Sequence, residues 1–240
     1  MAPQTISDHA TPLSAIEHPR QSADGLDEGI SHAPHASPWR WLYASLLLLA
    51  SVVNYVDRQT LSVLAVTMQR DLRLSDVGYA HVVQAFLLPY MVMYTLSGRL
   101  VDRFGARWTQ GAFLLVWSVA DACTGFARGF ASLAASRFAL GAAEPGNYTA
   151  SLRASADWFN ERERSIAVGM YSMGGTLGAA IAVPIAAGLA TRFGWRSAFF
   201  ITGAMGAVLA AIWMLLYRDP TPQQQPKAAV PWRQVLRHPN

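Results

Sequence analysis

The chain has 240 residues, of which 52% are hydrophobic and only 14% are charged, and its formal net charge is +4. An ordinary soluble domain carries about 25% charged residues, so the composition indicates an integral membrane protein. The positive charge is not gathered into a basic run with interleaved aromatic residues, so it does not predict a nucleic-acid partner.

The sequence predicts an all-α membrane protein built as one six-helix transmembrane bundle over residues 38–218. A spanning helix needs about 20 mostly apolar residues, and six windows meet this requirement. They lie at about 41–66, 79–100, 108–127, 130–152, 166–189 and 197–217.

The two ends of the chain differ from this bundle. Residues 1–37 are rich in Ser, His, Pro and acidic residues and contain no apolar run, so they predict a disordered cytoplasmic tail. Residues 219–240 are rich in Pro and Gln and predict an extended cytoplasmic linker, which the chain truncates. More basic residues lie in the loops on the side of both termini, which predicts an inner-membrane, multi-pass protein with both termini in the cytosol.

The first span contains Asp57 and Arg58 side by side in the run Asn54-Tyr55-Val56-Asp57-Arg58. Each charge near the centre of a spanning helix costs about 2.5 to 3.5 kcal/mol on insertion scales. Two interpretations account for this cost. One is an ion pair that only locks two helices together, and the other, which we favour, is a proton or substrate site facing a water-filled cavity.

The second span contains Pro89, which is expected to bend the helix, and Tyr90, whose hydroxyl lies at about half depth. From position alone, Tyr90 is as well explained by helix packing as by a cavity. The stretch from Gly98 to Arg107 then straddles the inner end of this span. Its glycines permit a tight turn, and Asp102 is expected at the N-terminus of the following helix.

The third and fourth spans contribute further charged residues. Asp121 is expected near the outer end of the third span, where an acid costs little, and it is assigned no role. In the fourth span Arg137 and Glu144 are seven residues apart, so both project from one helix face. Counting about 1.5 Å per residue places Asp57 and Arg137 at one depth, where they are able to pair, and places Glu144 near the level of Tyr90.

The fifth span carries Gly174, Gly175 and Gly178, which predict close packing of another helix rather than ligand binding. The histidines show no metal-ligand spacing, so neither a metal nor a cofactor is expected. No pattern combines a nucleophile, a base and oxyanion donors, so an enzyme is not expected.

Several motifs together resemble the N-terminal half of a transporter of the major facilitator superfamily, in the anion:cation symporter branch of hexuronate and galactonate transporters. The resemblance covers about residues 39–220. It is carried by the run around Asp57 and by the following segments: Gly98 to Arg107, Arg137-Phe138-Ala139-Leu140-Gly141-Ala142-Ala143-Glu144, Asp157-Trp158-Phe159, Glu163-Arg164-Ser165-Ile166-Ala167-Val168-Gly169 and Gly194-Trp195-Arg196-Ser197-Ala198-Phe199.

The resemblance implies a role for each matching residue. Asp57 and Glu144 would exchange protons, with Arg137 paired to Asp57. Arg58 would hold the substrate carboxylate, and Tyr55 and Tyr90 would bond its hydroxyls. The cytoplasmic gating loop would be formed by Gly98, Asp102, Arg103, Gly105 and Arg107.

The resemblance also implies the partners: a small organic anion, protons, the lipid bilayer, and a second six-helix half that is either missing or supplied by a second chain. Three positions depart from the family pattern. Met173 to Gly175 lack a frequent glutamine, Asn160 replaces a usual proline, and Pro145-Gly146-Asn147 is unusual after Glu144.

The function implied is proton-coupled symport of a sugar acid such as a hexuronate by alternating access. A carrier of another carboxylate, such as an aromatic acid, and a truncated, non-transporting membrane module are the alternatives.

Overall fold

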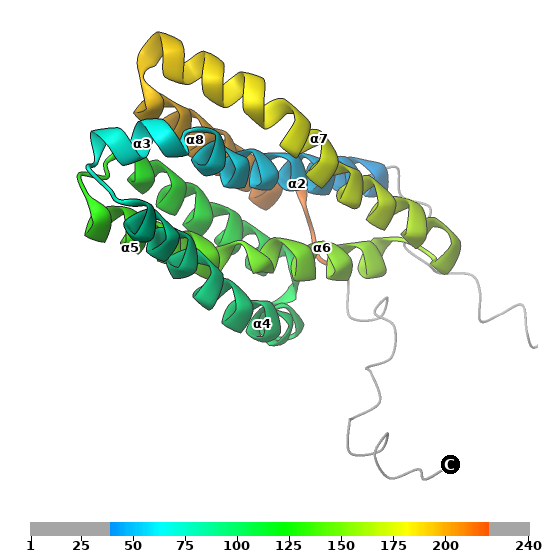
Figure 1. Ribbon diagram of the computed structural model, residues 1–240. Coiled ribbons are helices and arrows are strands. Elements are labelled where there is room, and N and C mark those ends of the chain that lie inside the picture. The colour runs from blue at the N-terminus through cyan, green and yellow to red at the C-terminus, as the bar shows by residue number, and fades with distance from the viewer. Residues whose placement is uncertain (1–38, 221–240) are drawn as a thin grey trace, which may run out of the picture. The chain divides into compact units, whose positions relative to one another are not determined.

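Helices account for nearly all of residues 39–220, the part of the chain that the computed structural model describes (Figure 1). This agrees with the predicted all-α class. The predicted tail and all but the start of the predicted C-terminal linker lie outside these residues. The helices are α2 (Trp39–Val63), α3 (Ala65–Asp71), α4 (Asp76–Gly125), α5 (Phe130–Ala143), α6 (Pro145–Trp158), α7 (Glu161–Phe193) and α8 (Trp195–Leu216).

Helix α4 is a pair of helices that folds back on itself at Gly105. Gly105 has φ 78° and ψ 168°, a conformation that favours glycine. Met93 and Val116 line the same pocket, although a straight helix would hold them about 35 Å apart. The helix pair therefore matches the second and third predicted spans. Within α4, the residues around Pro89 keep helical backbone angles.

Helices α5 and α6 follow each other almost without a break through Glu144. The backbone of Glu144 is helical, with φ −58° and ψ −39°, and its N–H still donates to the carbonyl of Leu140 at 2.9 Å. Pro145 then lacks an N–H group and sits at the start of α6, where a helix tolerates that loss. This junction places Glu144 in the middle of a nearly continuous helical rod.

The packing of α2 against α7 relies on the predicted glycine face. A Cβ atom on Gly174 would lie 2.7 Å from the carbonyl oxygen of Leu48, and one on Gly178 would lie 2.5 Å from that of Val52. The two helices therefore approach closely only because these side chains are absent. In the rest of the bundle, α4 packs against α5, α6 and α8, while α2 also packs against α8.

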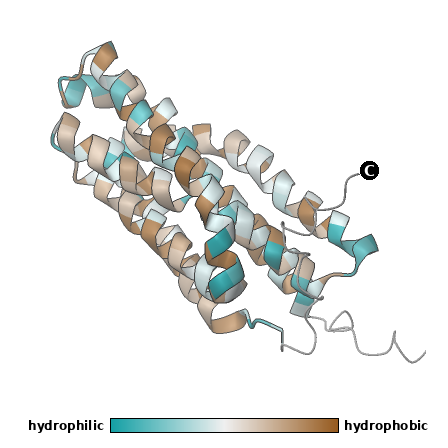
Figure 2. Cartoon of the chain, turned by 90° about the horizontal axis from the view of Figure 1, so that it is seen from below, coloured by the Kyte–Doolittle hydropathy of each residue, from teal (hydrophilic) through white to brown (hydrophobic). Residues whose placement is uncertain are grey.

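The outer surface is apolar over long stretches. Large side chains such as Leu88, Met91, Val208 and Leu215 are more than half exposed, and Figure 2 shows that the strongly hydrophilic residues lie mainly toward the helix ends. By length and hydropathy, three of the described helices are able to cross a membrane: α4, α7 and α8. An exposed apolar surface of this extent is stable in lipid rather than in water.

Candidate functional site

A cavity of about 350 Å³ lies among α2, α4, α6 and α7, and the predicted substrate residues line it. Arg58, Tyr55, Tyr90 and Glu144 all line it, which places all three predicted substrate residues and one predicted proton-coupling residue at one site. The full lining is Ser51, Asn54, Tyr55, Arg58, Tyr90, Tyr94, Glu144, Tyr148, Tyr171 and Ser172.

Arg58 and Glu144 form an ion pair at this cavity. The Nε atom of Arg58 donates to Oε2 of Glu144 at 3.1 Å, and Nη2 of Arg58 contacts the same oxygen. The Arg58 side chain is 33% exposed, whereas that of Glu144 is fully buried. Arg58 is therefore the member of the pair that a ligand in the cavity reaches first, and a buried charge such as Glu144 needs this partner.

Aromatic rings surround the Arg58 guanidinium. Its Cζ atom lies 5.0 Å from the ring centre of Tyr90 and 5.4 Å from those of Tyr55 and Phe86. Such cation–π contacts stabilise a cation that is partly removed from water. The aromatic wall continues through Tyr94, which stacks on Tyr148 at 5.9 Å between ring centres. Tyr90 is thus a cavity residue rather than only a packing residue.

A polar network leads from the cavity into the bundle. Asn147 donates from Nδ2 to the hydroxyl of Tyr171 at 3.3 Å and accepts from Nε2 of Gln110 at 2.6 Å. All three groups are buried or nearly so. In the sequence, Asn147 stands out only as a departure from the family pattern, and this network is not predicted, because the three residues meet only when the fold brings three helices together.

The expected ion pair between Asp57 and Arg137 is not formed. Asp57 is fully buried and accepts a hydrogen bond from Nε1 of Trp117 at 3.0 Å. Arg137 instead lies 3.5 Å from Asp121 and donates to the hydroxyl of Thr124 at 2.9 Å. Counting residues estimates depth, but depth does not determine which side of a helix a residue occupies.

Asp121 was expected near the outer end of its span, where an acid costs little, and was assigned no role; the structure shows instead that it is a buried acid. Its side chain is fully buried, and it accepts a hydrogen bond from the hydroxyl of Thr202 at 2.5 Å. An acid buried in a helix bundle needs a cationic partner and hydrogen bonds. The sequence signal for these contacts was an aspartate on a hydrophobic helix, with Arg137 on the following predicted span.

The predicted gating loop is the point where α4 folds back. Asp102 lies before Gly105 and is exposed, with Arg153 3.5 Å away, so it is not at the N-terminus of the second helix. That place is taken by Asp219, which accepts a hydrogen bond from the backbone N–H of Arg107 at 3.1 Å. Arg107 also donates from its side chain to the carbonyl of Met214 at 2.7 Å. Arg103 stacks on Phe104, and Gly98 has open space around its Cα.

The positions that depart from the family pattern have local explanations. A Cβ atom on Gly175 would lie 2.9 Å from the Tyr55 ring, so Tyr55 occupies the space that a larger residue there would need. Gly146 likewise lies against the ring of Phe113. Asn160 starts α7 by accepting a hydrogen bond from the N–H of Glu163 at 2.9 Å, a favoured role for asparagine.

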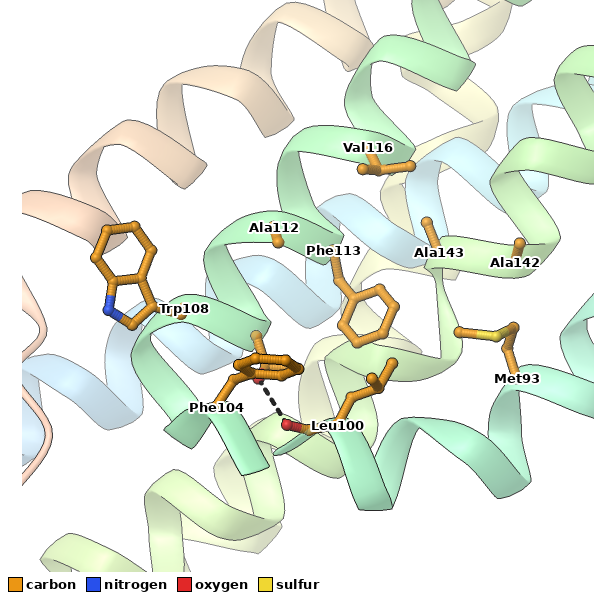
Figure 3. Close-up of a pocket in the computed structure, with 10 residues that line it drawn as sticks. Met93, Leu100, Phe104, Trp108, Ala112, Phe113, Val116, Ala142 and Ala143 are labelled. Atoms are coloured by element: carbon orange, nitrogen blue, oxygen red, sulfur yellow. Dashed lines mark hydrogen bonds between the residues drawn. The ribbon is translucent and has the colours of Figure 1, made fainter. Parts of the chain in front are cut away.

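A second, apolar pocket of about 480 Å³ lies between the two parts of α4 and α5. Figure 3 shows Leu100 and Phe113 facing each other across it, with Trp108 at its edge. The polar side-chain groups among its lining residues are the indole N–H of Trp108 and the hydroxyl of Thr109, which donates to the carbonyl of Leu100 at 3.5 Å. The lining includes no charged residue to pair with an anion. Among residues 39–220, no cluster of His, Cys, Asp or Glu is suited to a metal ion.

Comparison with known proteins finds relatives among bacterial transporters. The hexuronate transporter of Escherichia coli K12 is 34% identical over 185 residues, which are 77% of this chain and 43% of that protein. The galacturonate transporter of Dickeya chrysanthemi is 32% identical over 78% of this chain and 54% of its own length. The chain thus spans about half the length of the curated relatives it matches, and the predicted resemblance to this group is confirmed.

The fold is also found in a solved structure. A bacterial homolog of the human lysosomal transporter Spinster, in an inward-facing and unoccupied conformation, superposes with a TM-score of 0.72 at 24% identity, over 83% of this chain and 48% of that chain. The model of the Major Facilitator Superfamily matches residues 47–240. The chain therefore belongs to the Major Facilitator Superfamily.

Proposed function

We propose that this chain is the N-terminal half of a proton-coupled symporter for an organic anion, with a sugar acid such as a hexuronate as its substrate. The observation that carries the proposal is the Arg58–Glu144 pair, because its arginine is open to the cavity and its acid is fully buried. An arginine fork suits a carboxylate. The names of the curated relatives, which are transporters of hexuronate and galacturonate, support the substrate class.

The pair links substrate binding to proton binding. A substrate carboxylate that reaches Arg58 competes with Glu144 for the guanidinium. Glu144, once displaced, is an unpaired acid in a buried position, and it neutralises its charge by taking up a proton. Anion and proton therefore enter the site together, which is the requirement for symport.

The proposed topology has six spans. They are α2, the two parts of α4, the rod formed by α5 and α6, α7 and α8. Helix α2 does not meet the hydropathy criterion that α4, α7 and α8 meet, and α5 and α6 are 14 residues each, so neither is long enough to span by itself. Helix α2 carries Asp57 and Arg58, and the α5–α6 rod carries Arg137 and Glu144. The distribution of basic residues supports an inner-membrane location with both termini in the cytosol.

A second six-helix half would complete the pathway, since substrate sites of such transporters lie between two repeats. In alternating access, the two halves rock about the bound anion. The turn at Gly105, held by Asp219 and Arg107, would act as the cytoplasmic gating loop.

One observation favours a different carboxylate. Tyr94 and Tyr148 stack with an interplanar angle of 16°, beside Tyr90, and a wall of aromatic rings also suits the flat ring of an aromatic acid. The sugar-acid assignment rests on the relatives, whereas this alternative rests on the cavity wall.

The test is uptake of labelled glucuronate, galacturonate, galactonate and benzoate by cells that express the chain, alone and joined to the second half of the Escherichia coli hexuronate transporter. Uptake of the sugar acids by the joined form supports the proposal, and uptake of benzoate alone favours the aromatic acid. If the joined form reaches the membrane and carries none of these anions, the chain is a non-transporting module.

A further inference from the structure

The bundle contains a second buried charge cluster, which is separate from the cavity lining. Asp57 comes from α2, Asp121 from α4 and Arg137 from α5, and each of these residues is at most 1% exposed. Thr202 on α8 donates to Asp121, and the ring of Phe199 lies 5.2 Å from the Arg137 guanidinium. The groups that act electrostatically on Asp57 are Asp121, Glu144 and Arg137.

The cluster is incompletely bonded in a way that points to an alternative arrangement. Oδ1 of Asp57 and Oδ1 of Asp121 accept no hydrogen bond from the described residues, and Nε of Arg137 donates none to them. All three atoms are inaccessible to solvent. A buried polar atom without a partner is costly, and here Arg137 has an unused donor while each aspartate has an unused acceptor.

The charges of the cluster do not balance when both aspartates are ionised. Glu144 is compensated by Arg58, which leaves Arg137 as the cation for Asp57 and Asp121. Two carboxylates that share one cation in an apolar interior avoid the excess charge by holding one proton between them. In this structure Arg137 lies beside Asp121, and Asp57 is the aspartate of the cluster for which the described residues show no ion pair.

We propose that Asp121 is a positioning residue for proton coupling, which competes with Asp57 for Arg137 and thereby determines which of the two aspartates carries the shared proton. When Arg137 turns from Asp121 to Asp57, the proton leaves the Asp57 carboxyl group and Asp121 takes up one proton, so the cluster stays neutral. The inference extends the proposed coupling mechanism to a residue on α4.

Infrared spectroscopy of the purified chain in lipid nanodiscs tests the inference without requiring transport, so its result is independent of whether sugar acids are carried. The band of the buried, protonated carboxyl group is expected in the wild-type protein at neutral pH and lost in Asp57→Asn. It is also expected to be lost in Asp121→Asn, because Arg137 then pairs with Asp57 and removes the need for a proton. Asp76→Asn, which changes an exposed aspartate on the same helix, should leave the band unchanged.

A merely structural role for Asp121 would leave the Asp57 proton in place, so a band that survives Asp121→Asn would overturn the inference. If Asp121→Asn does not fold, Thr202→Val provides the second measurement. This variant removes the hydroxyl that stabilises the charged Asp121, so the proton moves from Asp57 to Asp121 and the band shifts. A band at an unchanged position in Thr202→Val would equally contradict the shared proton.

Discussion

Arg58 on α2 is bonded to Glu144 at the junction of α5 and α6, across 86 residues of sequence. The adjacent residue, Asp57, is bonded to Trp117 on α4 instead. Two neighbouring charges on one helix thus serve two separate sites, because consecutive helical residues point about 100° apart. The cavity lined by Arg58 and the buried charge cluster around Asp57 are therefore connected through one turn of α2.

Glu144→Gln is expected to separate substrate binding from proton binding. In the wild-type protein, affinity for the anion should rise as the pH falls, because Glu144 takes up a proton when it releases Arg58. With glutamine, the affinity should no longer depend on pH, and proton-driven accumulation should be lost. Calorimetric titration between pH 5 and 8 measures this, with Glu161→Gln as an exposed control. An unaltered pH dependence in Glu144→Gln would show that another group binds the proton.

Arg58→Lys should weaken substrate binding about tenfold or more, equivalent to about 1.4 kcal/mol. Lysine keeps the charge but loses the planar fork and its stacking on aromatic rings, and Arg58 is surrounded by Tyr55, Phe86 and Tyr90. Binding assays should find Arg128→Lys unchanged, since Arg128 is exposed at the turn before α5. An equal affinity for Arg58→Lys and wild type would place the anion elsewhere.

Gly174→Ala should destabilise the bundle by about 1 to 3 kcal/mol, the usual cost of overpacking. The new methyl group would meet the backbone of α2, which has no freedom to move aside. Gly188→Ala on the same helix is the matched control. It has open space around it, and alanine favours helix by about 1 kcal/mol over glycine. In detergent, the unfolding temperature should therefore fall for Gly174→Ala and rise for Gly188→Ala. Equal shifts in the two variants would argue against close contact of α2 and α7.

Asp219→Ala should destabilise the turn at Gly105 by about 1 kcal/mol, as for the loss of a helix N-cap. Asp219 accepts from the N–H of Arg107 and packs against Gly105. Asp102→Ala should have a smaller effect, because Asp102 is exposed and its contact with Arg153 is long. The unfolding temperatures of the two variants make the comparison. A larger decrease for Asp102→Ala than for Asp219→Ala would favour the predicted place of Asp102 at the N-terminus of the second helix.

The stability of the connection between α3 and α4 should depend on the ionisation of Asp71, the last residue of α3. Hydrogen bonds from Arg196 and Trp195 lower the pKa of Asp71 below its usual value. A lowered pKa in the folded state means that the stabilisation is present above about pH 4 and is lost as the pH falls through the folded value. Asp71→Asn should therefore reduce the unfolding temperature at pH 7 and match the wild type in acid. A difference that persists in acid would point to packing instead.

The sequence predicted the helices well, because their length, hydropathy and glycine spacing are local properties. The family resemblance also pointed to Arg58, Tyr55 and Tyr90, and the fold brings all three to one cavity. It did not predict that Arg137 pairs with Asp121, because counting residues estimates depth and not rotation about the helix axis. The sequence also did not predict that Asp219 accepts a hydrogen bond from the backbone of Arg107, because the two residues are 112 positions apart and only the fold brings them together.

The measurement that tests the central claim most directly is accumulation of labelled glucuronate by cells that express the chain joined to a second six-helix half, with and without a proton uncoupler. The account predicts accumulation above the external concentration, its collapse on addition of the uncoupler, and its absence in Glu144→Gln. Accumulation that persists with the uncoupler present, or in Glu144→Gln, would contradict proton coupling through the Arg58–Glu144 pair.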